Sequence, residues 1–72
     1  MAFPRKEVVE EIKKRYQAGT KVVLKKMDDI QAPPVGTKGL VQYVDDAGSV
    51  HIKWDTGSTL AVVYGEDEIA VC

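Results

Sequence analysis

The sequence of 72 residues predicts a mainly β fold, a small five-stranded antiparallel barrel with an N-terminal α-helix. Two stretches carry this prediction. Residues 36–41 (GTKGLV) have glycines where a chain enters a strongly curved strand, and residues 50–57 (VHIKWDTG) alternate apolar and polar side chains before a glycine turn. Such alternation is typical of a strand with one buried face. We therefore expect these stretches to form the centre of the barrel.

The N-terminal part of the chain predicts an amphipathic helix over residues 4–17. Pro4 suits the first helical turn, where its missing N–H would have no intrahelical partner. The apolar residues that recur at helical spacing are Val8, Val9, Ile12 and Tyr16. Because a short helix is marginal in water, this stripe needs a cover. We favour the barrel of the same chain, since residues 17–19 are a short connection, and keep a second copy of the chain as the alternative.

From residue 20 onward every apolar run is short and strand-like. The expected strands are residues 20–27, 37–44, 49–54, 59–63 and 68–71. Residues 28–36 contain two adjacent prolines, which lack the N–H that a strand needs, and predict a long exposed loop. Residues 45–48 (DDAG) predict a type I turn with a left-handed glycine, and residues 64–67 (YGED) predict one turn of 3₁₀ helix.

Strand alternation also predicts which side chains line the barrel interior. The expected interior residues are Val22, Leu24, Val41, Val50, Ile52, Leu60 and Ile69. The chain has room for one domain overall, with residues 1–19 as its helical segment and residues 20–72 as its barrel. Hydrophobic residues make up 44% and charged residues 29%, which is typical of a globular protein and not of a disordered one.

The order of these elements is similar to that of an SH3-like barrel: a long first loop, two tight hairpins and a one-turn helix before the last strand. The central strands, at residues 36–41 and 50–57, resemble those of Mind-bomb/HERC-type barrel domains and, more loosely, KOW modules. Residues 16–72 more specifically resemble a bacterial family catalogued as domain of unknown function 4314. The motifs that carry this resemblance are AGT at 18–20, KMDD at 26–29, APP at 32–34, GTxG at 36–39, VDDAG at 44–48, VHIKWD at 50–55 and GS at 57–58. The resemblance implies an SH3-like fold and a bacterial, phage or mobile-element setting, and it brings no activity or catalytic residues.

Residue types that perform chemistry are few in this chain. His51 is the only histidine, and the spacing implies neither a nucleophile nor an orienting carboxylate beside it. Cys72 is the only cysteine, so the two residues do not make a zinc site by themselves. The paired acids lack the alternating spacing of a calcium loop and fit turn chemistry instead. We expect no enzyme activity, no metal and no cofactor.

The single cysteine also bears on the compartment, because a chain with one cysteine forms no internal disulfide. This favours a reducing, cytoplasmic location. Residues 1–7 lack the apolar run of a signal peptide, and no window approaches the ~20 apolar residues that span a bilayer. We therefore expect no association with a membrane.

Charge is distributed unevenly, and this guides the prediction of partners. Residues 1–27 hold eight Lys/Arg and three acids, whereas residues 28–72 hold two lysines and eight acids. Because acids in the barrel oppose contact with phosphates, we expect a non-enzymatic module whose partner is a protein. The alternative is a nucleic-acid-binding accessory protein that uses the basic helix and first strand. A monomer is favoured, with a helix-mediated homodimer as the other possibility.

Each of these two interpretations has its candidate residues. For a protein partner the candidates are Tyr43, Tyr64, Trp54, Asp28, Asp29, Pro33 and Pro34. For nucleic acid they are Lys13, Lys14, Arg15, Lys21, Lys25 and Lys26. Trp54 has a second interpretation, in the core or at the barrel rim, because it shares its strand parity with Val50 and Ile52.

Overall fold

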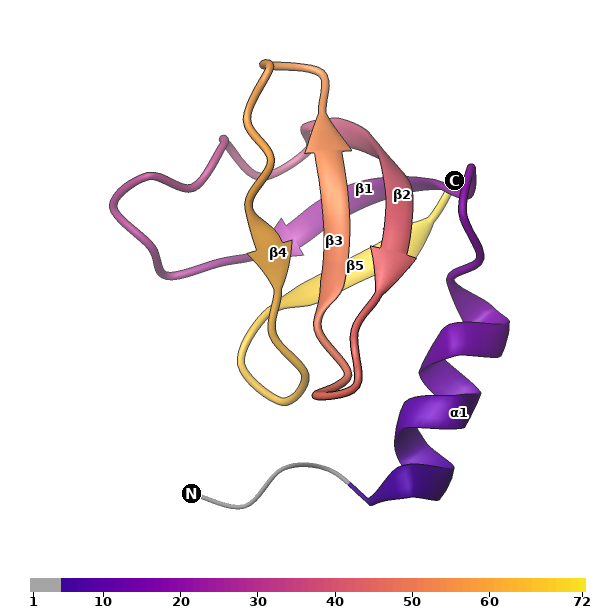
Figure 1. Ribbon diagram of the computed structural model, residues 1–72. Helices are drawn as coiled ribbons and strands as arrows, with labels where there is room; N and C mark the ends of the chain where they lie inside the picture. The colour runs from indigo at the N-terminus through magenta and orange to yellow at the C-terminus, as the bar shows by residue number, and fades with distance from the viewer. Residues whose placement is uncertain (1–4) are drawn as a thin grey trace.

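The computed structural model describes residues 5–72 as one helix beside a curved five-stranded antiparallel sheet (Figure 1). The elements are α1 (Lys6–Arg15), β1 (Lys21–Lys26), β2 (Lys38–Val44), β3 (Val50–Trp54), β4 (Ala61–Val62) and β5 (Glu68–Val71). The prediction of a mainly β fold with an N-terminal helix is confirmed. The predicted helix start at Pro4 lies outside the described residues.

The five strands form a single sheet in the order β4-β3-β2-β1-β5. Sequential strands pair as hairpins from β1 to β4, and β5 then returns to pair with β1, so that the first and last strands are neighbours (Figure 1). This order is compatible with the SH3-like barrel that the sequence predicts. The turn at residues 45–48 also forms as predicted, with a hydrogen bond from Gly48 N–H to the Asp45 carbonyl oxygen and a positive φ of 82° at Gly48.

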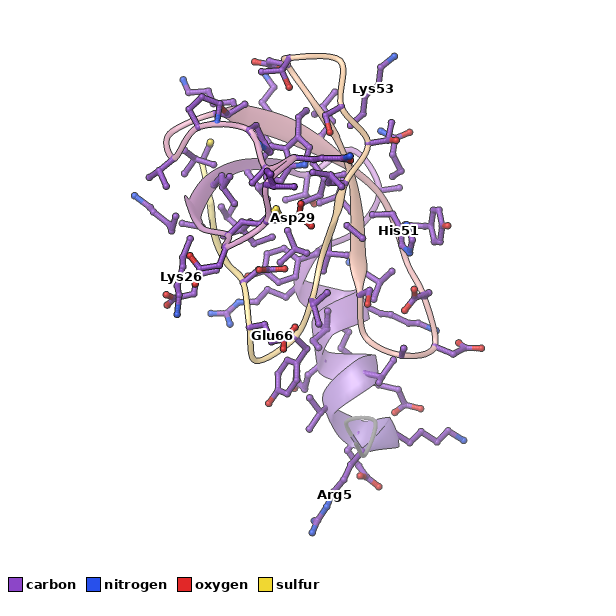
Figure 2. The ribbon with its side chains drawn as sticks, turned by 90° about the vertical axis from the view of Figure 1, so that its left-hand side faces the viewer. Arg5, Lys26, Asp29, His51, Lys53 and Glu66 are labelled. Carbon is purple, nitrogen blue, oxygen red and sulfur yellow. The ribbon has the colours of Figure 1, made fainter. Side chains whose placement is uncertain are left out.

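Helix α1 packs against the sheet along one side only. Ile12 and Tyr16 are half-buried against the core, and an ion pair of 3.0 Å joins Lys13 Nζ to Asp46 Oδ1 in the turn between β2 and β3. Figure 2 shows Arg5 at the end of α1 that points away from the sheet. The helix ends at Arg15, two residues before the predicted end, because Tyr16 leaves the helical conformation. Val9 is also buried, at 6% exposure, whereas Val8 at the start of the stripe is only half-buried. The predicted packing of the stripe on its own chain is therefore found for Val9, Ile12 and Tyr16.

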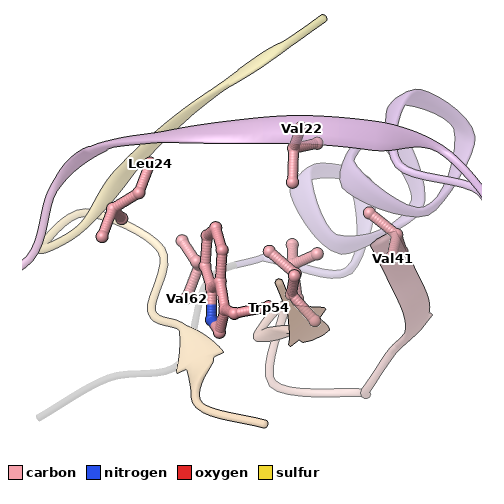
Figure 3. Packing of buried hydrophobic residues seen from close by; sticks show 7 residues of the cluster. Val22, Leu24, Val41, Trp54 and Val62 are labelled. Carbon is pink, nitrogen blue, oxygen red and sulfur yellow. The ribbon is translucent and has the colours of Figure 1, made fainter. Parts of the chain in front are cut away.

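The core lies on the concave side of the sheet (Figure 3). Its buried residues are Val22, Leu24, Val41, Val50, Ile52, Trp54 and Val62. Five of the seven predicted interior residues are among them, and the other two, Leu60 and Ile69, are half-buried against the cluster. Trp54 belongs to this core with an exposed fraction of 1%, and its indole N–H donates to the Leu60 carbonyl oxygen at 3.0 Å. The buried indole therefore has its polar group satisfied.

Gly39 lets β2 cross closely over β3. A Cβ at this position would lie 2.6 Å from Ile52 Cγ2 and 2.9 Å from Trp54 Cε3, which is closer than side chains tolerate. The sequence predicts that this glycine serves strand curvature, and the structure gives the local reason: two core side chains occupy the space that a Cβ would need.

Two predicted elements are corrected by the structure. Strand β4 spans two residues instead of the five predicted. The backbone N–H of Trp54 donates to the Ser58 carbonyl oxygen, and its indole N–H donates to the Leu60 carbonyl oxygen. The residues before Ala61 therefore do not continue the regular strand pairing. Residues 64–67 form a hydrogen-bonded turn and not a 3₁₀ helix, because Gly65 adopts a positive φ of 85° that a right-handed helix excludes.

Candidate binding surfaces

Exposed lysines gather on the convex side of the sheet. Lys21 on β1, Leu40 on β2 and Lys53 on β3 are cross-strand neighbours in the sheet register. Lys38 lies two residues before Leu40, so that it points to the same side. Neighbouring strands are ~4.8 Å apart, which places the Cα atoms of Lys21 and Lys53 about 10 Å apart. We call Lys21, Lys38, Leu40 and Lys53 the lysine face.

The lysine face has a positive charge that its surroundings leave largely uncompensated. The ion pairs found within residues 5–72 are Lys13–Asp46 and His51–Asp45, and neither involves the lysine face. Asp55 follows β3 and borders the face, since its backbone N–H bonds the Lys38 carbonyl oxygen. The Debye length is about 8 Å at physiological ionic strength, so the potentials of these exposed ammonium groups overlap only in part there and add more strongly at low salt.

Four of the eight acids in residues 28–72 gather elsewhere. Asp28, Asp29, Glu66 and Asp67 line a pocket of about 420 Å³ between the loop after β1 and the turn before β5, together with Lys26. Figure 2 shows Lys26 on the left of the molecule, Glu66 near the middle, and Lys53 and His51 on the right. The folded chain therefore separates these four acids from the lysine face.

A second feature of the convex side is a stacked pair of rings. Tyr43 and His51 lie with ring centroids 4.2 Å apart and planes 9° from parallel. A β-bulge in β2 brings them together, because Val41 pairs with Ile52 and Tyr43 pairs with His51, which leaves Gln42 as the extra residue. In a regular strand Tyr43 would share the inward side of Val41, whereas after the bulge it is 55% exposed.

Asp45 holds the imidazole of this pair in place. Its Oδ2 lies 2.8 Å from His51 Nε2, and its Oδ1 accepts hydrogen bonds from the N–H groups of Ala47 and Ser49 at 3.0 and 2.9 Å. The hydrogen bond from His51 lowers the pKa of the Asp45 carboxyl below its usual value, the two backbone N–H groups act in the same direction, and burial opposes them. Because an ionised carboxylate only accepts, Nε2 of His51 carries a proton.

The expectation that no orienting carboxylate lies beside His51 is therefore wrong. Asp45 is six residues away in sequence, but it follows directly on the paired residues of the tight hairpin, so that its carboxylate reaches the His51 ring on β3. The hairpin register is the signal that finds this pair. Within residues 5–72 the side-chain hydrogen bond of the His51 ring is the one to Asp45.

The predicted protein-binding residues do not form one surface. Tyr43 and Tyr64 are exposed, at 55% and 53%, but on different parts of the fold. Trp54 lies in the core and offers no surface to a partner, which corrects its place among the candidates. Pro33 is also buried whereas Pro34 is exposed, so the loop is not exposed throughout.

The two acids of this loop, Asp28 and Asp29, are engaged in local structure. Asp29 Oδ1 accepts the backbone N–H of Gln31 at 2.8 Å and so stabilises the turn, as the short side chains of Asp and Asn commonly do. Both Asp28 and Asp29 line the pocket beside the turn before β5.

The predicted nucleic-acid-binding residues are likewise divided. Lys13 is engaged by Asp46, and Lys26 pairs in register with Glu68 and lines the acidic pocket. Lys25 is exposed at the far end of β1, and Lys14 and Arg15 line a groove beside the helix. Only Lys21 joins the lysine face. Sequence reasoning missed Lys38 and Lys53, because single lysines within apolar strands become neighbours only through the register.

A groove runs between α1 and the turn before β5. Its volume is about 770 Å³, and its apolar lining consists of Val8, Ile12, Tyr16 and Tyr64. The side chains of Val8, Ile12 and Tyr16 are half-buried, so the stripe of α1 is covered only in part by its own sheet.

Within residues 5–72, no group of three or more His, Cys, Asp or Glu side chains is arranged to hold a metal ion, and no helix is long and apolar enough to cross a membrane.

A comparison with known protein families identifies the family to which the chain belongs. The family described as "Domain of unknown function (DUF4314)" matches residues 5–72. The chain belongs to this family. The predicted resemblance is thus confirmed over the helix as well as the sheet. No curated protein matches the chain. The description of DUF4314 assigns no activity, so a function for this member has to be argued from its own surfaces.

Proposed function

We propose that this DUF4314 protein is a non-enzymatic binding module that holds nucleic acid through the lysine face. The observation that carries the proposal is the cross-strand alignment of Lys21, Leu40 and Lys53, with Lys38 beside them. Among residues 5–72 no carboxylate forms an ion pair with these lysines. Three ammonium groups on flexible stems reach phosphate oxygens at several spacings, which suits a repeating polyanion. Leu40, 40% exposed at the centre, offers apolar contact to a sugar or a base.

The separation of charge supports this choice over the one that the sequence favours. Sequence reasoning took the acids of the barrel to oppose nucleic acid. In the folded chain four of those acids line the pocket on the Lys26 side, and the carboxylate of Asp45 is occupied by hydrogen bonds from His51 and from two backbone N–H groups of the hairpin turn. A polyanion that approaches the convex side of β1–β3 meets mainly lysines.

Salt dependence tests the proposal directly. We expect the wild-type protein to bind a labelled oligonucleotide with an affinity that falls steeply between about 50 and 200 mM salt. A Lys21→Gln/Lys38→Gln/Lys53→Gln variant removes three phosphate contacts. Its plot of log affinity against log salt is expected to be flatter by about 2, since each contact to a single strand contributes ~0.7. Fluorescence anisotropy measures both slopes.

A matched control removes the same charge from elsewhere. Lys14→Gln/Lys25→Gln/Lys26→Gln takes its three lysines from the basic set that the sequence predicts, and it has the same net charge as the first variant. We expect its salt slope to stay close to that of the wild type. If the control flattens the slope as much as the first variant does, the lysine face is not the binding surface. If the wild type binds no nucleic acid at low salt, the proposal fails entirely.

A protein partner in the groove beside α1 is the second candidate, and the charges along the groove favour it. Glu7 and Glu11 flank its start, and Lys14 and Arg15 flank its end. An antiparallel copy of α1 would place acids opposite bases along the whole contact. The partner that these charges fit is a second copy of the chain.

Analytical ultracentrifugation tests this second candidate. In a homodimer, Val8→Glu places a charge in the shared groove and is expected to convert the dimer into a monomer. Lys25→Glu, on an exposed position of β1, is the control for an added acid and is expected to leave the dimer intact. A wild-type chain that sediments as a monomer at all concentrations would remove this candidate and leave the lysine face unaffected.

A further inference from the structure

We infer that the Tyr43–His51 stack is a base-stacking site, which makes the nucleic acid bound at the lysine face single-stranded. This inference rests on the proposed function, because the stack needs the lysine face to hold the backbone beside it. It adds a statement that charge alone does not make, namely that the ligand presents unpaired bases.

The first argument is the β-bulge that exposes the tyrosine. Gln42 is the extra residue of β2, so Gln42 and Tyr43 both face outward where regular alternation would bury one of them. The bulge turns a large aromatic side chain away from the core and leaves it 55% exposed. Bulges commonly re-aim a side chain at functional sites, and an apolar core alone gives no reason to expose this ring.

The second argument is that the ring is held in a fixed orientation. His51 covers one side of Tyr43 with nearly parallel planes, and Asp45 fixes the imidazole edge through Nε2. Asp45 is fixed in turn by two backbone N–H groups of the hairpin turn. A base that stacks on Tyr43 therefore meets a ring that is already ordered and loses little conformational entropy on the protein side.

The third argument is the position of the stack. His51 lies two residues from Lys53 on the same side of β3, a distance of ~7 Å along the strand. A backbone whose phosphate contacts Lys53 places a neighbouring base within reach of Tyr43. In a duplex each base is stacked on its own neighbours, so a protein ring gains this contact only from a single strand.

Two oligonucleotides of equal charge separate stacking from charge. The first is a labelled oligothymidylate of about 12 nucleotides, within the range of roughly 4–16 that a small barrel covers. The second has the same phosphates and sugars but is abasic. We expect the wild type to bind the oligothymidylate about 5- to 150-fold more tightly, which corresponds to the stacking of one base. Equal affinities for the two ligands would overturn the inference while leaving the lysine face in place.

Two substitutions then assign the difference to Tyr43. Tyr43→Leu keeps an apolar side chain on the strand and removes the aromatic plane, so we expect its affinity for the oligothymidylate to fall to that for the abasic strand. Its affinity for the abasic strand and its salt slope are expected to remain those of the wild type. Tyr43→Phe keeps the plane and should retain the preference.

Other outcomes of these measurements have distinct meanings. If Tyr43→Leu weakens both ligands equally, the stack has only a structural role as a cross-strand pair and the inference is wrong. Thermal unfolding reports whether Tyr43→Leu folds. If it does not fold, the inference is tested by the affinities of the wild type and of Tyr43→Phe for the two ligands, and a preference for the oligothymidylate in both supports it. If neither ligand binds the wild type, the proposed function itself has failed.

Discussion

The two faces of the β1–β3 sheet differ in what their side chains do. On the concave side, Val22, Ile52 and Trp54 are buried at 1% exposure or less and hold the fold together. On the convex side, Lys21 and Lys53 flank a half-exposed Leu40 and contribute charge to the surface. Both faces come from the same strands by simple alternation. The difference teaches that one set of strands specifies stability with its inward residues and leaves its outward residues free for binding.

The largest effect is expected on the concave side. Ile52→Ala removes three buried carbons from the centre of the core and is expected to lower the free energy of unfolding by about 2–5 kcal/mol, a large part of the total for a small domain. Leu40→Ala is the control on the convex side, and because Leu40 is 40% exposed its cost is expected to be much smaller. Denaturant unfolding followed by Trp54 fluorescence measures both. Equal costs for the two variants would contradict the assignment of the faces.

Gly39→Ala tests how closely β2 approaches the core side chains of β3. The new Cβ would lie 2.6 Å from Ile52 Cγ2 and 3.0 Å from the backbone oxygen of Lys53, so β2 has to move away from β3. We expect a loss of about 1–3 kcal/mol. Thermal unfolding measures it, and Gly57→Ala, at a turn with open space around its Cβ position, separates a packing effect from the strain of a positive φ. An unchanged midpoint for Gly39→Ala would show that the strands are farther apart.

Asp45→Asn tests the hairpin that supports the stacked rings. The carboxylate is 36% exposed, so the loss of its charge-assisted hydrogen bonds is expected to cost about 1–2 kcal/mol near neutral pH. Because the pKa of Asp45 is lowered in the folded state, its contribution is present above its unfolded value of 3.8 and is lost as the pH falls through the lowered folded value. Urea unfolding from pH 7 to pH 3 should therefore show the wild type and the variant converging in acid. A difference that grows in acid would contradict this sign.

The smallest effect on stability is expected at the lysine face. Lys21→Gln, Lys38→Gln and Lys53→Gln change exposed side chains without ion pairs to residues 5–72, so each is expected to alter the unfolding free energy by no more than about 0.5 kcal/mol. Unfolding curves of the triple variant measure this sum. A strongly destabilised variant would mean that these lysines serve the fold, and the contrast between the two faces would then disappear.

The interior of this fold is largely predictable because strand parity is a local property. Val50 and Ile52 alternate with the polar residues Ser49, His51 and Lys53, and their burial follows from the sequence alone. Trp54 follows the same rule, and of its two predicted positions, the core and the barrel rim, the structure shows the core. Leu60 is less buried than expected because its carbonyl oxygen serves the indole of Trp54 outside a regular strand.

The convex side is less predictable because it depends on register and on one extra residue. Lys38 and Lys53 become neighbours of Lys21 only once three strands are aligned. The bulge at Gln42 reverses the side on which Tyr43 lies, and alternation without the bulge gives the opposite answer. Asp45 and His51 meet across a turn whose exact pairing the sequence does not specify.

The pairing of β5 with β1 has a consequence for the order in which the molecule assembles. Val22 pairs with Val71, whereas Val44 pairs with Val50 across a short turn. The longer loop costs about 2 kcal/mol more in closure entropy, since each doubling of loop length adds ~0.6 kcal/mol. We expect the β2–β3 hairpin to form early in folding and β5 to join last. The stacked rings and two of the three lysines lie on that hairpin, so most of the proposed binding surface is assembled before the sheet closes.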